Sequence, residues 1–133
     1  KCQKKINQDM LAFLNRNSFS FPPDHGSRLV TIVLQDNTLR KNWEEELRKI
    51  RSGMIENRNA LARELRSRTG SDHFGFLSEH RGMFSLLGFS EDKVSELRFK
   101  HGIYMVSDSR VNIAALSKTT IPIVAEAIIS VGL

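Results

Sequence analysis

The 133 residues are about the length of a single domain, which excludes a large multi-domain assembly. With 40% hydrophobic residues, 26% charged residues and three prolines, the composition is typical of a folded globular protein and excludes disordered and collagen-like chains. The formal net charge of +5 would permit binding to a polyanion, but the basic residues after Asn42 alternate with glutamates as on a solvated helix face, so we expect no nucleic-acid partner.

The first third of the chain is predicted to contain a short helix, a loop and a second apolar element. Apolar residues recur between positions 6 and 14 at the spacing of one helical face, which predicts a helix that ends near Asn15. The pair Pro22-Pro23 cannot continue a helix and predicts a structured loop over residues 18–26. Residues 29–34 fit a buried strand or a buried helix, and of the two we favour a helix.

A long amphipathic helix is predicted from Thr38 to Arg68. Apolar residues recur there in steps of three and four residues, with one step of seven. Asp36 or Asn37 is expected to cap its start, and Gly70 is expected to end it. At about 1.5 Å per residue it is longer than a small core requires, so we expect it to connect two domains.

Short strands and two helices are predicted in the second half. Serine and acidic residues at the start and glycine at the end predict a helix between Ser90 and Gly102, and a last helix is expected over residues 120–131. Apolar and aromatic runs predict strands over residues 74–77, 83–89, 103–106 and 111–116. The predicted fold class is α/β with an α+β-like small domain, in which a small mixed sheet packs with two helices after the long helix.

The chain shows no familiar catalytic or metal-binding pattern. Its four histidines lie in different segments without the spacing of a helical zinc pair, so no metal site is predicted. Cys2 is the single cysteine, which fits a reducing compartment; we expect a cytoplasmic location, with the mitochondrial matrix as the alternative. No apolar run reaches the length of a membrane span, so no membrane partner is expected. The first residues lack a methionine and a signal sequence, which indicates a cut within a longer protein.

Two arginines in apolar surroundings are candidates for binding an acid. Arg16 precedes the proline loop, and Arg110 lies where a predicted turn meets a strand. A guanidinium fork matches a carboxylate in bidentate geometry, so two arginines facing one cavity would select a dicarboxylic acid. The alternative is that both form ordinary surface ion pairs.

Five segments in order resemble the C-terminal third of aspartate aminotransferases, the class I, fold-type I pyridoxal-phosphate enzymes. The similarity extends from about Arg16 to the C-terminus without a large gap. The segments are Ser20-Phe21-Pro22-Pro23-Asp24-His25-Gly26, Asn42-Trp43-Glu44, Arg81-Gly82-Met83-Phe84-Ser85, Gly102-Ile103-Tyr104 and Ser109-Arg110-Val111-Asn112.

The resemblance implies roles for three residues. Arg110 would bind the α-carboxylate of the substrate, and Arg16 would reach across a homodimer interface to the distal carboxylate in the neighbouring active site. Phe84 would pack near cofactor and substrate. Residues 1–48 would be a remnant of the large cofactor-binding domain with the start of the long helix, and residues 49–133 would be the small domain that closes over a dicarboxylic amino acid or a 2-oxo acid.

The resemblance also implies what this chain lacks. The lysine that holds pyridoxal 5'-phosphate as a Schiff base is expected N-terminal to Lys1, so we predict no catalytic or cofactor-binding residue here, and no cofactor binding or activity for these residues alone. Phe21, Ser109 and Ala115 depart from the family pattern; Ser109 replaces a glycine, which costs about 1 kcal/mol only if the backbone needs a positive φ. The alternatives are a catalytically inactive interaction domain, a divergent family member or a basic nucleic-acid binder.

Overall fold

The computed structural model describes residues 2–21 and 23–132. It divides into two compact units, residues 1–45 and 46–133. The division falls inside a single continuous helix. The expected domain boundary between residues 48 and 49 lies three residues from it and stays a prediction.

The N-terminal unit contains helices α1 (Cys2–Phe19) and α2 (His25–Gln35) and the start of α3. The predicted end of the first helix near Asn15 is wrong, because nothing between Asn15 and Phe19 breaks a helix. The chain turns instead at Ser20, whose φ of 55° is left-handed and whose N–H donates to the carbonyl of Arg16. The helix favoured over residues 29–34 is confirmed as part of α2, but the expected burial is wrong, since none of the residues of α2 is buried.

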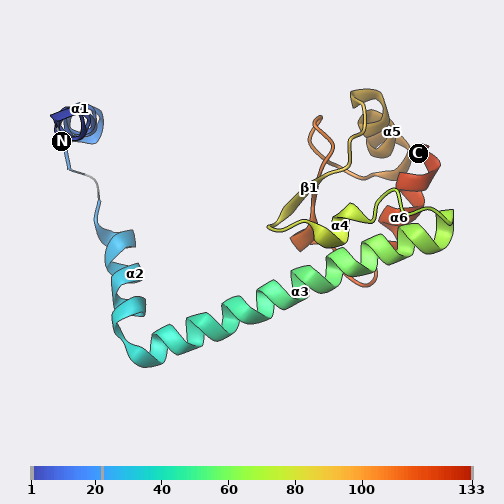
Figure 1. The fold of residues 1–133 in the computed structure, drawn as a ribbon, viewed down its shortest axis with the longest axis horizontal. Helices are drawn as coiled ribbons and strands as arrows, with labels where there is room; N and C mark the ends of the chain where they lie inside the picture. Colours follow the sequence, from blue (N-terminus) through green and yellow to red (C-terminus); the bar gives the residue numbers. More distant parts are fainter. Residues whose placement is uncertain (1, 22, 133) are drawn as a thin grey trace. The chain divides into compact units, whose positions relative to one another are not determined.

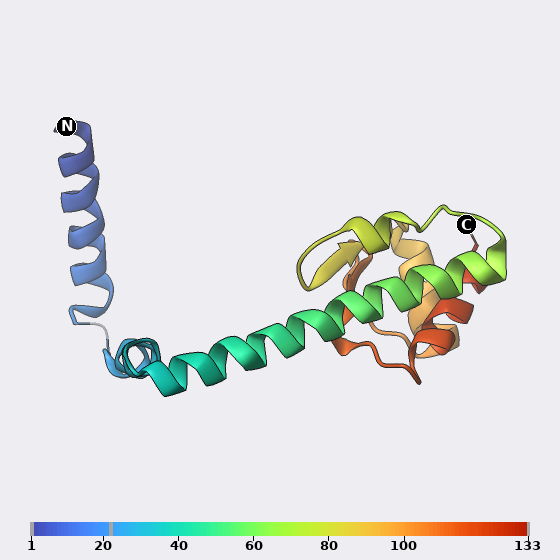
Figure 2. The ribbon, with the colours of Figure 1, turned by 60° about the horizontal axis from the view of Figure 1, so that its bottom comes forward.

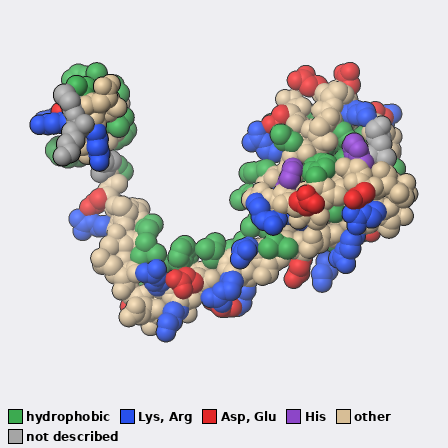
Figure 3. Space-filling view, in the orientation of Figure 1, with side chains coloured by type: hydrophobic (Ala, Val, Ile, Leu, Met, Phe, Trp, Pro, Cys, Tyr) green, Lys and Arg blue, Asp and Glu red, His purple; other side chains and the backbone are tan. Residues whose placement is uncertain are grey.

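Apolar side chains of the N-terminal unit lie on its surface. Figure 3 shows hydrophobic side chains following α2 and the first part of α3. The apolar stripe predicted on α1 is exposed: Ile6, Met10, Phe13 and Leu14. Large apolar residues of α2 and of the start of α3 are also at least 41% exposed: Leu29, Val30, Ile32, Leu34, Leu39 and Trp43. The stripe on α1 thus has the spacing of a helical face, but no other part of the described chain buries it.

Helix α3 (Asn37–Thr69) confirms the predicted long helix to within one residue at each end. Asp36 caps it, since its Oδ1 accepts from the backbone N–H groups of Thr38 and Leu39, each at 2.8 Å. Gly70 ends it with a φ of 67°, and its N–H donates to the carbonyl of Arg66. Both ends therefore follow from local sequence.

The other elements of the C-terminal unit pack against one side of the second half of α3, as Figures 1 and 2 show. Its further elements are α4 (Phe76–Glu79), β1 (Phe84–Leu86), α5 (Glu91–His101), β2 (Arg110–Asn112), a 3-10 helix η1 (Ile113–Ala115) and α6 (Ile121–Ser130). The expected helices after Ser90 and near the C-terminus are confirmed as α5 and α6. The predicted fold class is confirmed, since the unit combines helices with a small sheet.

The sheet of the described residues has two antiparallel strands, so it is smaller than predicted and is not mixed. Phe84 pairs with Asn112, Ser85 with Val111 and Leu86 with Arg110. The strands predicted at 74–77 and 103–106 are wrong, and 111–116 is a strand only to Asn112 before it becomes η1. Phe74 and Leu77 are both buried one turn apart, so packing selects a turn and α4 over a strand.

One main core holds the C-terminal unit together. Side chains of α3, α4, η1 and α6 are fully buried within it, including Leu61, Leu65, Leu77, Ile113 and Ile128. A smaller cluster joins α5 to α6 through Leu97 and Ala127. The two-stranded ladder lies on this core through its middle residues, since Ser85 and Val111 are buried while their neighbours along each strand are exposed.

Candidate functional site

The ladder brings Phe84 and Arg110 together on one face. Alternate residues of a strand point to the same side, and in both strands the outer positions are exposed. Since Arg110 pairs with Leu86, it is a diagonal neighbour of Phe84. The centre of its guanidinium lies 5.8 Å from the centre of the Phe84 ring, within the range of a cation–π contact. Two of the three residues predicted for the site thus meet.

A cavity of about 460 Å³ opens beside this pair. Phe84 and Arg110 line it together with mostly apolar residues of segment 103–106, η1 and α6, among them Tyr104, Leu116 and Val124. One cation at the edge of an apolar hollow is suited to a ligand that combines a carboxylate with an apolar group. None of the described residues lining the cavity is a lysine, so these residues do not complete a Schiff-base site for pyridoxal phosphate.

Arg110 also forms an ion pair with Asp108 across the turn. Its Nη2 and Nε donate to Asp108 Oδ2 at 2.5 and 3.1 Å, and its backbone N–H donates to Oδ1 at 3.1 Å. The hydrogen bond from the guanidinium lowers the pKa of the Asp108 carboxyl below its ordinary value. The Arg110 side chain is 47% exposed, so the ion pair with Asp108 faces solvent, as the sequence alternative of a surface ion pair expects. Arg110 also borders the cavity.

Ser109 fixes the start of β2 through an unusual backbone conformation. Its φ is 62°, so the position does need the left-handed conformation that the family pattern fills with glycine. The residue is 1% exposed, and its Oγ accepts from the backbone N–H groups of Gly88 and Phe89 at 3.0 and 3.1 Å. These bonds join the turn before Arg110 to the chain after β1 and offset the cost of the strained backbone.

Arg58 of α3 is a buried cation that our sequence analysis did not single out. It is 3% exposed, and its guanidinium donates to Leu77 O, Ser85 Oγ, Gly82 O and Phe84 O. Burial is the main cause that lowers its pKa, followed by repulsion from Arg81. The sequence contained an indication of this burial. Between Met54 and Leu61 the apolar face of the helix skips one position, and Arg58 occupies that position.

Arg16 lies in the last turn of α1, within the N-terminal unit. Its residue is exposed, and its carbonyl accepts from Ser20. Arg16 thus belongs to a different unit from Arg110 and Phe84.

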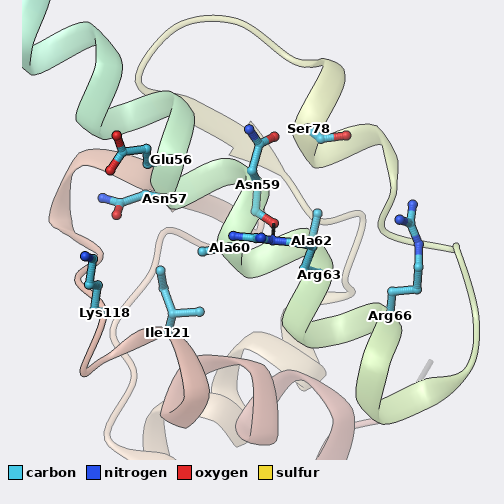
Figure 4. A pocket seen from close by; sticks show the side chains of 10 residues that line it. All are labelled: Glu56, Asn57, Asn59, Ala60, Ala62, Arg63, Arg66, Ser78, Lys118 and Ile121. Carbon is cyan, nitrogen blue, oxygen red and sulfur yellow. Dashed lines mark hydrogen bonds between the residues drawn. The ribbon is translucent and has the colours of Figure 1, made fainter.

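A second and more polar hollow of about 600 Å³ lies between α3 and the segment before α6 (Figure 4). Its polar side chains already hold the fold together: Asn57 donates to the carbonyls of Ile113 and Leu116, and Arg66 pairs with Asp72. Arg63 donates to the carbonyl of Asn59 one turn earlier. Three of its polar lining residues thus serve the fold, and Glu56 and Lys118 line the hollow as well.

Residues 2–21 and 23–132 contain neither a metal-binding cluster nor a membrane-spanning helix. No three or more His, Cys, Asp or Glu side chains in this part of the chain gather to hold a metal ion. No helix in it combines the length and the apolar character needed to span a bilayer.

Comparison with known proteins gives one consistent answer. The model of the family "Aminotransferase class I and II" matches residues 6–128. An aromatic-amino-acid aminotransferase of Paracoccus denitrificans is 53% identical over 129 residues, which cover 97% of this chain and 33% of that protein. An aspartate aminotransferase of Pseudomonas aeruginosa is 37% identical over 116 residues, covering 87% of this chain and 29% of the relative.

A solved structure agrees with these relatives. The structure of an aromatic amino acid aminotransferase with 3-indolepropionic acid superposes with a TM-score of 0.92 at 52% identity, covering 99% of this chain and 34% of that one. The chain thus spans about a third of the length of the proteins it matches.

Proposed function

The chain belongs to the class I and II aminotransferase family, and we propose that it is the carboxylate-binding portion of a pyridoxal-phosphate-dependent enzyme that exchanges amino groups between aromatic amino acids and 2-oxo acids. The single observation that carries this proposal is the position of Arg110 beside Phe84 at the rim of an apolar cavity. The 53% identity to an aromatic-amino-acid aminotransferase supports the aromatic class.

In this proposal Arg110 binds the α-carboxylate. Its planar fork can donate two parallel hydrogen bonds to a carboxylate, provided that the substrate competes with Asp108 for it. Phe84 supplies a ring against which the substrate can pack, and the apolar cavity walls can contact its apolar group. These contacts orient the substrate; they perform no proton transfer themselves.

The cofactor is expected to be held by residues outside the part described here. When bound, pyridoxal phosphate supplies the electron sink on which amino-group transfer depends. The chain's described residues around Arg110 contribute no lysine to such a site, so we infer that residues 1–133 alone do not transaminate.

Arg110→Lys in the complete holoenzyme tests the proposal. A lysine keeps the charge but loses the bidentate fork, so we expect KM for an aromatic amino acid to rise about tenfold or more with a smaller change in kcat. Arg63→Lys, at an exposed position of α3, is the matched control. An unchanged KM in Arg110→Lys would contradict the role of Arg110. A complete protein without pyridoxal-phosphate absorbance or transamination would favour the inactive interaction domain instead.

A second candidate is the aspartate type, with a dicarboxylic substrate. The exposed Arg16 at the end of α1 and the match to aspartate aminotransferases favour it. In this version Arg16 binds the distal carboxylate across a homodimer interface. Arg16→Leu then lowers kcat/KM for aspartate strongly while that for phenylalanine changes little; equal effects on both substrates would count against the dicarboxylic role.

A further inference from the structure

We propose that Arg58 is a positioning residue for substrate binding: its buried guanidinium holds β1 in place and thereby sets where the Phe84 ring meets Arg110. The inference rests on the proposed function, because it assigns Arg58 to the same carboxylate site. Arg58 does not border the cavity beside Arg110, so it would act through Phe84 and not on the substrate.

The contacts of Arg58 join three separate segments. One terminal nitrogen donates to Leu77 O at the centre of α4 and to Ser85 Oγ in β1, at 3.2 and 2.6 Å. The other donates to Gly82 O in the loop and to Phe84 O in β1, at 2.6 and 3.2 Å. All four acceptors lie at least 19 residues along the chain from Arg58, so they are tertiary contacts.

The guanidinium takes the place of a third strand. Carbonyl groups alternate between the two edges of a strand, and Met83 O accepts from Ile113 on the side of β2. Gly82 O and Phe84 O therefore point to the opposite edge, where the described sheet has no further strand. Arg58 supplies the donors there, so its buried guanidinium binds the edge of β1 that a neighbouring strand would otherwise pair with.

A lysine cannot reproduce this arrangement. An ammonium group is a single point on a flexible stem, whereas the rigid fork of arginine reaches several acceptors in fixed directions. No carboxylate lies among the hydrogen-bond partners of the Arg58 guanidinium in the described residues, so its charge is balanced by oriented carbonyls and a hydroxyl. Breaking such a buried set costs more than the bonds lost, because both the cation and the acceptors lose their partners.

Phe84 is consequently fixed from both edges. Its carbonyl is held by Arg58, while its strand is held in register by the pairing of Phe84 with Asn112. Phe84 is 47% exposed and its side chain is not buried in the core, so the distance from its ring to Arg110 depends on where the backbone of β1 lies. A shift of β1 would separate the ring from the guanidinium and misplace the surface on which the substrate acid lies.

Arg58→Lys in the complete holoenzyme tests this role, with Arg63→Lys as the matched control on the same helix. The probe is 3-indolepropionic acid, an aromatic monocarboxylate, and its Kd is measured together with KM and kcat for phenylalanine. At a temperature where circular dichroism shows full folding, we expect Arg58→Lys to raise Kd and KM about tenfold, with kcat changed much less. The control variant should match wild type.

Ser85→Ala serves where Arg58→Lys does not fold. It removes one of the four acceptors, and we expect a smaller rise in Kd in the same direction. If Arg58→Lys, or Ser85→Ala in its place, lowers thermal stability but leaves Kd and KM unchanged, Arg58 is merely structural and the inference is overturned. If the wild-type holoenzyme itself neither binds the probe nor transaminates, the proposed function fails, which is a different result.

Discussion

Replacing Ser109 with alanine and with glycine separates its hydrogen bonds from its backbone strain. Alanine removes both bonds from Gly88 and Phe89 but keeps the left-handed φ of 62°, so we expect a loss of about 2 kcal/mol in the free energy of unfolding. Glycine loses the same bonds but relieves a conformational cost of about 1 kcal/mol, so its net loss should be about 1 kcal/mol.

Urea unfolding followed by circular dichroism measures these differences, and amide hydrogen exchange locates them. Exchange should accelerate in both variants at the N–H groups of Gly88 and Phe89, which lose their acceptor. Ser107→Ala, at an exposed position in the same turn, is the control and should lie within about 0.5 kcal/mol of wild type. Equal losses for alanine and glycine would refute the strain argument, and an alanine variant as stable as wild type would refute the role of the hydroxyl.

Two further predictions concern charge and backbone. Because the pKa of Asp108 is lowered, its pairing with Arg110 should be fully present above the ordinary aspartate pKa of about 3.9 and be lost only as the pH falls through the lower value. NMR titration of the Asp108 carboxyl checks this, and a midpoint that does not rise in Arg110→Met would contradict it. Gly102→Ala places a side chain at a φ of 66° with open space around it and should destabilise by about 1 kcal/mol, whereas Gly53→Ala within α3 should stabilise by about 0.5 kcal/mol. Urea unfolding of both variants would contradict the backbone argument if the two changes had the same sign.

The elements with both periodicity and end signals could be predicted from the sequence. Helix α3 has a repeating apolar face, an aspartate at its start and a glycine at its end, and α5 has the serine cap and glycine end that were expected. Local chemistry decides such elements, so the sequence is sufficient for them.

The short apolar runs could not be assigned in the same way. Residues 74–77 and 103–106 have the composition of strands, but each is too short for its period to separate strand from turn or helix. Phe74 and Leu77 enter the core one turn apart, and this tertiary packing determines the local structure. The ladder that does form has only three residues in each strand.

The candidate site was partly accessible from sequence. The resemblance pointed to Arg110 and Phe84, and the structure places them in contact. Arg58 was missed because an arginine in an apolar stripe looks like a surface residue until its distant acceptors are known. Those acceptors are backbone carbonyls and a serine hydroxyl, and a sequence gives no indication of where they converge.

The alternation along the ladder has a consequence for how the chain folds. If β2 slipped by one residue against β1, Arg110 would turn toward the core in which Val111 is now buried, and Val111 would face water. An unpaired guanidinium within that apolar layer would be strongly unfavourable. The guanidinium that we expect to recognise the substrate thus also destabilises the chain when its strands pair in the wrong register. A chain with this error would not form a packed core, and so would not form a defective site.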